Sequence, residues 1–253
     1  MCNPSNVNDE PKKIEVNSSP LRWVRGMIYA SIFTLSYILA PSYILSAIIA
    51  LLLRFPNGNI SFLYSLPLLI SIMTPARPMP HVVGLLTPML DYFQFEQIIE
   101  DEETLRMNLD KGKNYILAAQ PHGVLSLCGI CSCIHTDVRY RKINTAVASS
   151  LLTFPILKNV MGIFQLVDAS AKSLKKILRE KNGIEGSVVL YVGGIAELFK
   201  CSREKEILHL SQRKGFIKLA LREGVDIIPV YLFGNTSVLS VVRTNMMYIF
   251  SSL

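Results

Sequence analysis

The chain has 253 residues, a formal net charge of +7 and a hydrophobic fraction of 50%. This length allows one sizeable α/β core or two small units, and the mean hydropathy is positive, which is high for a wholly water-soluble protein. The positive charge suits an anionic partner such as a phospholipid surface or a phosphorylated cofactor. We expect no nucleic-acid partner, because no basic and aromatic binding motif accompanies the charge.

The amino-terminal part of the chain predicts a membrane attachment. Residues 1–22 are polar and predict a loose cytosolic tail. Residues 27–53 carry no charge and exceed the length of about 20 apolar residues that a spanning helix needs. A second apolar run at 60–74 is shorter and predicts a return helix or a re-entrant piece. Because the first run is too long for the core of a signal peptide, we predict a membrane helical hairpin over residues 23–75.

Basic residues flank this predicted hairpin on both sides, and only Arg54 lies between its two arms. The positive-inside bias therefore places both ends of the hairpin in the cytosol. Pro41 lies inside the first apolar run. If the chain turns at this proline, a different hairpin results, and the sequence leaves this alternative open.

Residues 76–253 predict an α/β domain. The predicted strands are 114–119, 143–149, 163–169, 187–192 and 225–234. Helical stretches are predicted within 91–110, and single helices at 155–161, 170–181 and 214–224. Ser170 is the expected N-cap of one helix and Gly224 the expected end of another. Apolar strands that alternate with amphipathic helices are typical of a mostly parallel sheet covered on both faces.

The first predicted strand ends in Gln120-Pro121-His122-Gly123. In open α/β sheets, functional groups gather at the carboxyl ends of strands. Pro121 suits the first turn of a following helix, and Gly123 would let a substrate approach the imidazole closely. A helix N-terminus there would keep His122 neutral, as a general base must be. The alternative interpretation is a surface histidine in a turn.

Three later stretches belong with this tetrapeptide: Gly193-Gly194-Ile195-Ala196-Glu197, Arg213-Lys214-Gly215-Phe216 and Pro229-Val230-Tyr231-Leu232-Phe233-Gly234. In this order and spacing, the four motifs resemble those of the type-2 diacylglycerol acyltransferase family, which includes monoacylglycerol and wax-ester-forming acyltransferases. The resemblance extends over residues 22–238. The family's usual His-Pro-His-Gly appears here with Gln120 in its first position, which suits a mechanism in which only the second histidine acts. The chain ends soon after the last motif, so we expect the α/β domain to be incomplete at its C-terminus.

The resemblance implies a membrane-bound enzyme that moves a fatty-acyl group from acyl-CoA to diacylglycerol and forms triacylglycerol. His122 would be the general base that deprotonates the acceptor hydroxyl, and Glu197 is the candidate for orienting it. Backbone N–H groups at the start of the helix after Gly123 would stabilise the oxyanion. The neighbouring loop residues implied in the site are Gln120, Pro121, Gly123, Gly193 and Gly194.

The implied partners are acyl-CoA as a substrate, an acylglycerol acceptor and the membrane lipid bilayer, with no cofactor and with room for a homo-oligomer. The basic residues Arg213, Lys214 and Lys218 are candidates for binding the phosphates of acyl-CoA, although a solvated face or a contact with anionic lipid headgroups would explain them equally well. The implied location is the endoplasmic reticulum membrane with the catalytic domain in the cytosol, or else a lipid droplet.

Two further hypotheses stay open. Cys128, Cys131 and His135 would share one face of a helix, with Cys133 nearby, and such groups can bind zinc. The spacing fits no paired zinc knuckle, so we favour small buried cysteines and expect no metal. The acceptor could instead be monoacylglycerol or a wax alcohol, or the chain could be a truncated, non-catalytic membrane or lipid-droplet protein.

Overall fold

The computed structural model describes residues 19–140, 143–180, 182–194, 196–197, 201 and 206–237. The strands are β1 (Tyr115–Gln120), β2 (Asn144–Val147), β3 (Leu166–Asp168), β4 (Val188–Tyr191) and β5 (Asp226–Tyr231). They form one sheet in the order β3-β2-β4-β1-β5, and every neighbouring pair is parallel. The predicted parallel α/β fold is confirmed. Most of the predicted tail and the last sixteen residues of the predicted domain lie outside the described residues.

The helices are α1 (Pro20–Leu53), α2 (Gly58–Met73), α3 (Pro80–Leu85), α4 (Pro88–Tyr92), α5 (Glu102–Asp110), α6 (Leu127–Tyr140), α7 (Ser149–Thr153), α8 (Leu157–Met161), α9 (Ala171–Arg179) and α11 (Gly215–Glu223). The predicted helical region 91–110 contains the end of α4 and all of α5, and an irregular segment separates the two helices. Gln94 takes a left-handed φ of 49° just after α4, and the Asp101 carboxylate accepts the Thr104 N–H to begin α5.

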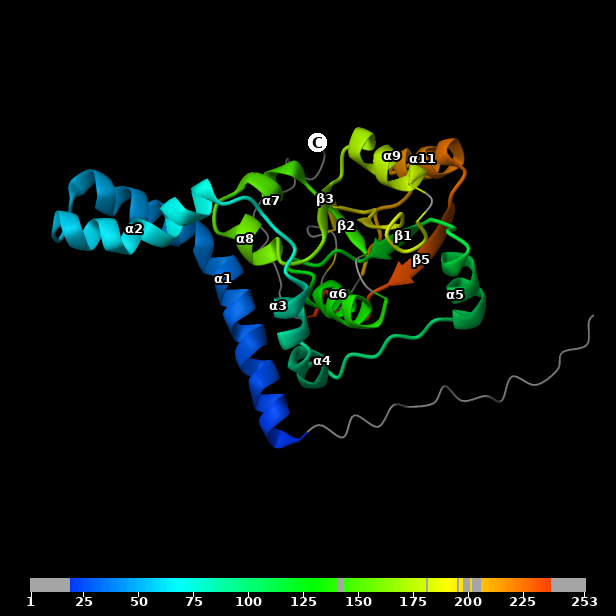
Figure 1. Cartoon of the computed structure of the whole chain (residues 1–253), viewed down its shortest axis with the longest axis horizontal. Coiled ribbons are helices and arrows are strands. Elements are labelled where there is room, and N and C mark those ends of the chain that lie inside the picture. The colour runs from blue at the N-terminus through cyan, green and yellow to red at the C-terminus, as the bar shows by residue number, and fades with distance from the viewer. Residues whose placement is uncertain are drawn as a thin grey trace, which may run out of the picture.

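The helix signals at α9 and α11 are confirmed. The Ser170 hydroxyl accepts the N–H of Ser173 at the start of α9, and Gly224 ends α11 with a left-handed φ of 65°. Both helices cover the same face of the sheet (Figure 1). Their apolar side chains and those of the sheet form one buried cluster: Ile116, Ala146, Leu174, Leu178, Val188, Leu219 and Ala220. The helix α6 lies against the opposite face.

The first half of α1, before Pro41, packs on the α/β part of the molecule. The rings of Trp23 and Tyr92 lie 5.1 Å apart between centroids, and those of Phe33 and Phe164 lie 6.1 Å apart. Gly26 approaches α4 so closely that a Cβ there would lie 2.1 Å from the carbonyl oxygen of Pro88. The first half of α1 therefore belongs to the core that also contains residues of α4 and α6.

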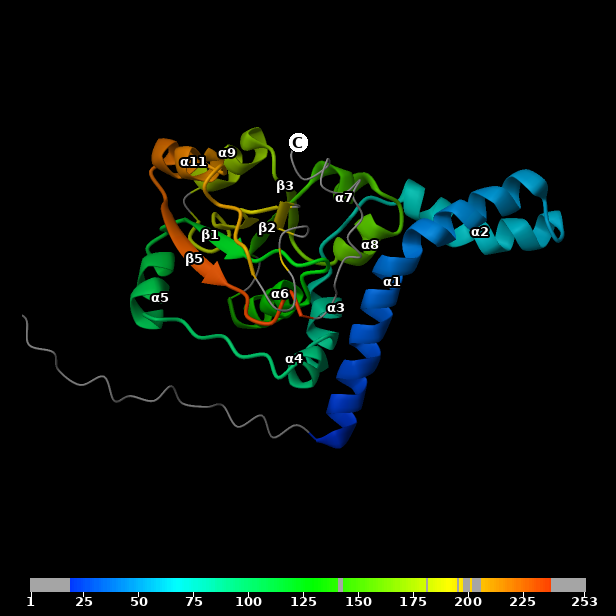
Figure 2. The same ribbon diagram turned by 180° about the vertical axis from the view of Figure 1, so that it is seen from behind.

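The second half of α1, after Pro41, packs against α2 instead. The Tyr43 hydroxyl donates to the carbonyl of Tyr64 at 2.8 Å, and the Ser65 hydroxyl donates to the carbonyl of Ala47 at 3.0 Å. Pro41 lies between the two halves of α1. The helix changes direction along its length (Figures 1 and 2), as expected at an interior proline. The helix α1 continues through Pro41, and the chain turns between α1 and α2 at residues 54–57 instead. By length and composition, α1 is the one described helix that could cross a membrane.

Candidate active site

The loop after β1 places His122 at the carboxyl edge of the sheet, as the sequence predicted. Gly123 follows with a φ of 64°, in the left-handed region that favours glycine. The prediction that Pro121 enters the first turn of a helix is wrong, because α6 begins only at Leu127. The left-handed residue turns the chain before the helix can start.

The imidazole of His122 is held by its own neighbour. Its Nδ1 lies 2.7 Å from the carbonyl oxygen of Gly123. Because a carbonyl oxygen can only accept a hydrogen bond, Nδ1 carries the proton and donates it, and Nε2 keeps a lone pair. The ring is half-buried and lies edge-on to Tyr191, with the centroids 4.9 Å apart. The geometry therefore leaves Nε2 as the basic atom of this histidine.

Glu197 is fully buried beside this loop but does not contact the imidazole. Its Oε2 accepts the main-chain N–H of His122 at 3.0 Å, and its Oε1 accepts the main-chain N–H of His209 at 3.1 Å. The carboxylate therefore joins the main chain of the histidine loop to the main chain at His209. Gly193 is needed because a Cβ there would lie 1.9 Å from the Glu197 carboxyl carbon, and Gly194 continues the same turn after β4.

Asn235 is a central residue of the site that the sequence reasoning missed. Its side chain is 1% exposed. The amide nitrogen donates to the carbonyl oxygens of Pro121 and His122, both at 2.9 Å, while the amide oxygen accepts the N–H of Cys128 at 3.2 Å. One side chain therefore ties the histidine loop to the start of α6. The available signal was its position just after β5, which ends at the same edge as β1.

Two of the expected oxyanion donors at the start of α6, the N–H groups of Leu127 and Cys128, are already in use. Asn235 occupies the N–H of Cys128, and the carbonyl of Leu125 accepts the N–H of Leu127 at 2.7 Å. Within the described residues, no acceptor contacts the N–H groups of Gly123 and Val124. These two N–H groups directly follow His122 in the chain.

Gln120 is the last residue of β1. Its side-chain oxygen is buried and has no hydrogen-bond partner within the described part of the chain. A buried amide oxygen without a donor is unfavourable unless water or a ligand supplies one. The position that holds the first histidine in the family resemblance therefore presents an acceptor next to the histidine loop.

The three basic candidates lie at the start of α11, which covers the face of the sheet opposite α6. Arg213 and Lys214 form the turn before α11, Lys218 lies in its first turn, and all three are exposed. Because α11 leads back to the start of β5, its N-terminus lies at the carboxyl edge where His122 also lies. No hydrogen bond or ion pair joins these three residues to His122 among the described residues.

Cys128, Cys131 and Cys133 lie on α6. Among the described residues, no group of three His, Cys, Asp or Glu side chains is arranged to hold a metal ion. Cys131 is buried, and this burial raises the pKa of its thiol, which disfavours the thiolate that zinc requires. Cys133 instead lines an apolar cavity.

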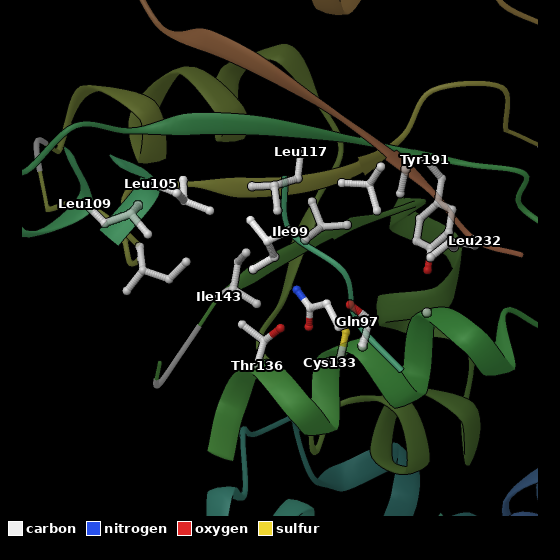
Figure 3. Close-up of a pocket in the computed structure, with 16 residues that line it drawn as sticks. Gln97, Ile99, Leu105, Leu109, Leu117, Cys133, Thr136, Ile143, Tyr191 and Leu232 are labelled. Atoms are coloured by element: carbon white, nitrogen blue, oxygen red, sulfur yellow. The ribbon is translucent and has the colours of Figure 1, made fainter. Parts of the chain in front are cut away.

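This cavity lies between the sheet and α6 and has a volume of about 80 Å³. Its lining extends from Leu105 and Leu109 on α5 to Tyr191 and Leu232 at the carboxyl edge (Figure 3). The Tyr191 hydroxyl is hydrogen-bonded to Ser126 at 2.9 Å, and burial raises the pKa of this hydroxyl. Because Tyr191 contacts the His122 ring, one end of the cavity lies beside the imidazole.

Comparison with known proteins agrees with the motifs. Residues 59–249, which are most of the chain, match the family described as diacylglycerol acyltransferase. No solved structure matches the chain.

Several proteins named diacylglycerol O-acyltransferase 2 are similar to this chain. The one from Dictyostelium discoideum is 34% identical over 154 residues, 58% of this chain and 44% of that protein. The one from Xenopus tropicalis is 35% identical over 50% of this chain and 37% of its own length, and the one from Homo sapiens is 31% identical over 52% and 35%. The matched part therefore spans less than half of each of these relatives.

Proposed function

Because the chain belongs to the diacylglycerol acyltransferase family, we propose that it transfers a fatty-acyl group from acyl-CoA to the free hydroxyl of diacylglycerol. The product is triacylglycerol. The observation that carries this proposal is the hydrogen bond between His122 Nδ1 and the Gly123 carbonyl at 2.7 Å, which leaves Nε2 free to accept a proton. Relatives named diacylglycerol O-acyltransferase 2 support the choice of acceptor.

In this mechanism, Nε2 of His122 takes the proton of the acceptor hydroxyl while its oxygen attacks the thioester carbon of acyl-CoA. The carbonyl oxygen becomes an oxyanion, and the N–H groups of Gly123 and Val124 donate to it; each such donor is typically worth about 3 kcal/mol. When the intermediate collapses, the carbon–sulfur bond breaks and the thiolate of CoA takes the proton from the imidazolium. The Gly123 carbonyl stabilises that imidazolium through Nδ1–H. No acyl-enzyme forms.

The remaining site residues have supporting roles. Glu197 and Asn235 hold the backbone of the histidine loop in place, since each accepts from or donates to its main chain. Arg213, Lys214 and Lys218 bind the phosphates of CoA from the carboxyl edge of the sheet. The reaction uses acyl-CoA as a substrate and needs no cofactor.

We place the hairpin in a membrane. Large apolar side chains are exposed on both of its arms, among them Leu52, Leu53, Phe62, Leu63 and Met73. Exposed apolar surface of this extent is unfavourable in water and typical of contact with a bilayer. The proposed location is the endoplasmic reticulum membrane with the sheet on the cytosolic side, and the surface of a lipid droplet is the alternative.

The test uses membranes from a host deficient in neutral lipid that expresses the chain, its His122→Ala variant or its His81→Ala variant. His81 is an exposed histidine on α3 and serves as the matched control. With labelled acyl-CoA, we expect triacylglycerol from the chain and from His81→Ala, and a decrease of about 10²- to 10⁴-fold for His122→Ala.

The lipid class of the product identifies the acceptor. Diacylglycerol or wax ester in place of triacylglycerol would identify monoacylglycerol or a fatty alcohol as the acceptor. No product from any of the three proteins, with all of them present in the membrane, would contradict the proposal and favour a non-catalytic membrane protein.

A further inference from the structure

Resting on the proposed function, we propose that the cavity beside His122 binds one unbranched fatty-acyl chain. The reacting end of that chain lies at Tyr191, and its methyl end lies beneath α5. We call this cavity the acyl slot. Its shape, its lining and its cover each support the assignment.

The slot exists because of the residues that α6 turns toward the sheet. The opposite face of α6 fills the core with large side chains such as Leu127, Ile130 and Ile134. Toward the sheet, residues 129–136 present only small side chains: Gly129, Ser132, Cys133 and Thr136. These four follow the i, i+3, i+4, i+7 spacing of one helix face. Since close packing normally fills the space between a helix and a sheet, a face of small side chains leaves a gap.

The sheet supplies the other wall. Leu117 pairs with Val189 and Ala119 with Tyr191 in the parallel register of β1 and β4, so these four side chains point to the same face. The lining crosses the sheet from Ile143, just before β2 at the amino edge, to Leu232, just after β5 at the carboxyl edge. The slot therefore lies between the sheet and α6 and extends from one edge of the sheet toward the other (Figure 3).

The end near His122 is shaped by a glycine. A Cβ at Gly129 would lie 1.7 Å from the Tyr191 hydroxyl, so any larger residue there would displace the tyrosine. With glycine in place, Tyr191 fits between α6 and the His122 ring and marks the entrance. The reacting carbon of a chain that enters at Tyr191 comes to lie next to the imidazole.

The cover of the slot is loosely attached. The segment Phe95–Asp110, which we call the α5 strap, contributes Gln97, Ile99, Leu105 and Leu109 to the lining. None of the residues of α5 is buried. Segments with few buried contacts open at low free energy. The enclosed volume of about 80 Å³ holds only part of a long chain, so the strap moves outward when a chain enters.

The chemistry of the lining selects the ligand. No charged side chain lines the slot within the described residues, so neither the phosphates of CoA nor a glycerol headgroup suits its interior. An unbranched hydrocarbon chain suits both its length and its lining. Such a chain belongs to the acyl donor and also to the acylglycerol acceptor, and the experiment distinguishes these two sources.

The first measurement is chain-length preference. Thr136→Phe fills the part of the slot far from His122, so kcat/KM for long acyl-CoA should fall by about fourfold for each methylene that no longer fits. Activity with short acyl-CoA should persist, which also shows that the variant folds. Leu105→Ala enlarges the same end and should shift the preference toward longer chains. The control is Thr153→Phe, the same change at an exposed position of α7 that does not line the slot, which should keep the original profile.

The second measurement does not depend on activity. Palmitoyl-CoA with a photoreactive diazirine at its methyl end is crosslinked to the full chain in membranes. The label should appear on peptides that contain Leu105, Leu109 or Ile143, should decrease in Thr136→Phe and should remain in Thr153→Phe. Diacylglycerol carrying the same diazirine forms the second arm, and whichever arm labels these peptides identifies the source of the chain.

The outcomes separate the slot from the proposed function. Labelling of these peptides without any product would support the slot and contradict the acyltransferase function. Product with an unchanged chain-length profile in Thr136→Phe, or labelling confined to other peptides, would overturn the slot while the function stands.

Discussion

The two faces of the sheet are built differently, although the same strands form both. Ile116 points toward α9 and α11 and is completely buried in a close-packed cluster. Its neighbour Leu117 points toward α6 and is only half-buried, at the wall of the acyl slot. One face therefore holds the domain together by packing, and the other leaves space next to the histidine. Stability and ligand binding are divided between the two sides of single strands.

The largest expected effect compares these two neighbours directly. Ile116→Ala should lower the free energy of unfolding by about 2–5 kcal/mol, because it leaves a cavity in a close-packed cluster. Leu117→Ala should lower it by about 1 kcal/mol, since that side chain is already half exposed to a cavity. Denaturation in detergent measures both. Equal losses would show that the α6 face is as tightly packed as the other one.

The second prediction concerns the polar end of the open face. Asn235→Ala should lower the free energy of unfolding by about 1–3 kcal/mol, because it leaves buried main-chain groups of the histidine loop without partners. It should also lower kcat. The control is Asn144→Ala, since Asn144 is buried at the amino edge of the sheet and donates to the carbonyl oxygens of Glu185 and Ser187. A similar loss of stability with unchanged kcat is expected there. If both variants lose kcat equally, Asn235 has no specific positioning role.

The smallest expected effect lies on the packed face, where Arg179 of α9 donates to Glu223 of α11 at 2.8 Å. This hydrogen bond lowers the pKa of the Glu223 carboxyl below its usual 4.5. The pair therefore stabilises the fold above pH 4.5, and this contribution disappears as the pH falls through the lowered pKa. Melting curves of the chain and of Arg179→Gln should differ slightly at neutral pH and converge in acid. A difference that grows in acid would contradict this assignment.

The fold was largely predictable because its strands are short apolar runs bounded by glycine, proline or charge. β1, β4 and β5 all lie where such runs occur in the sequence. Their order in the sheet was not predictable, since an apolar strand carries no mark of its neighbour. The break between α4 and α5 was not predictable, because the charge pattern of 91–110 is compatible with a helix throughout, while the left-handed Gln94 depends on tertiary packing.

The candidate site was predictable for a residue that directly follows a strand. It was not predictable for residues that the order of the strands in the sheet brings together. His122 follows from the rule that functional groups gather at the carboxyl edge. Glu197 was expected near it, but only the structure shows that its carboxylate accepts main-chain N–H groups. Asn235 and Tyr191 reach the histidine because β5 and β4 both flank β1. Without knowledge of the strand order, the sequence gives no reason to place Asn235 and Tyr191 beside His122.

The bend of α1 near Pro41 separates two kinds of tolerance to insertion and deletion. An extra residue in the first half of α1, ahead of Phe33, would rotate the later side chains of that half by about 100°. It would move Phe33 and Tyr37 out of the core. An extra residue beyond Pro41 would change the length of the hairpin but leave the contacts of Trp23, Gly26 and Phe33 untouched. The hairpin can therefore lengthen or shorten over evolutionary time while the sheet and its histidine keep their places.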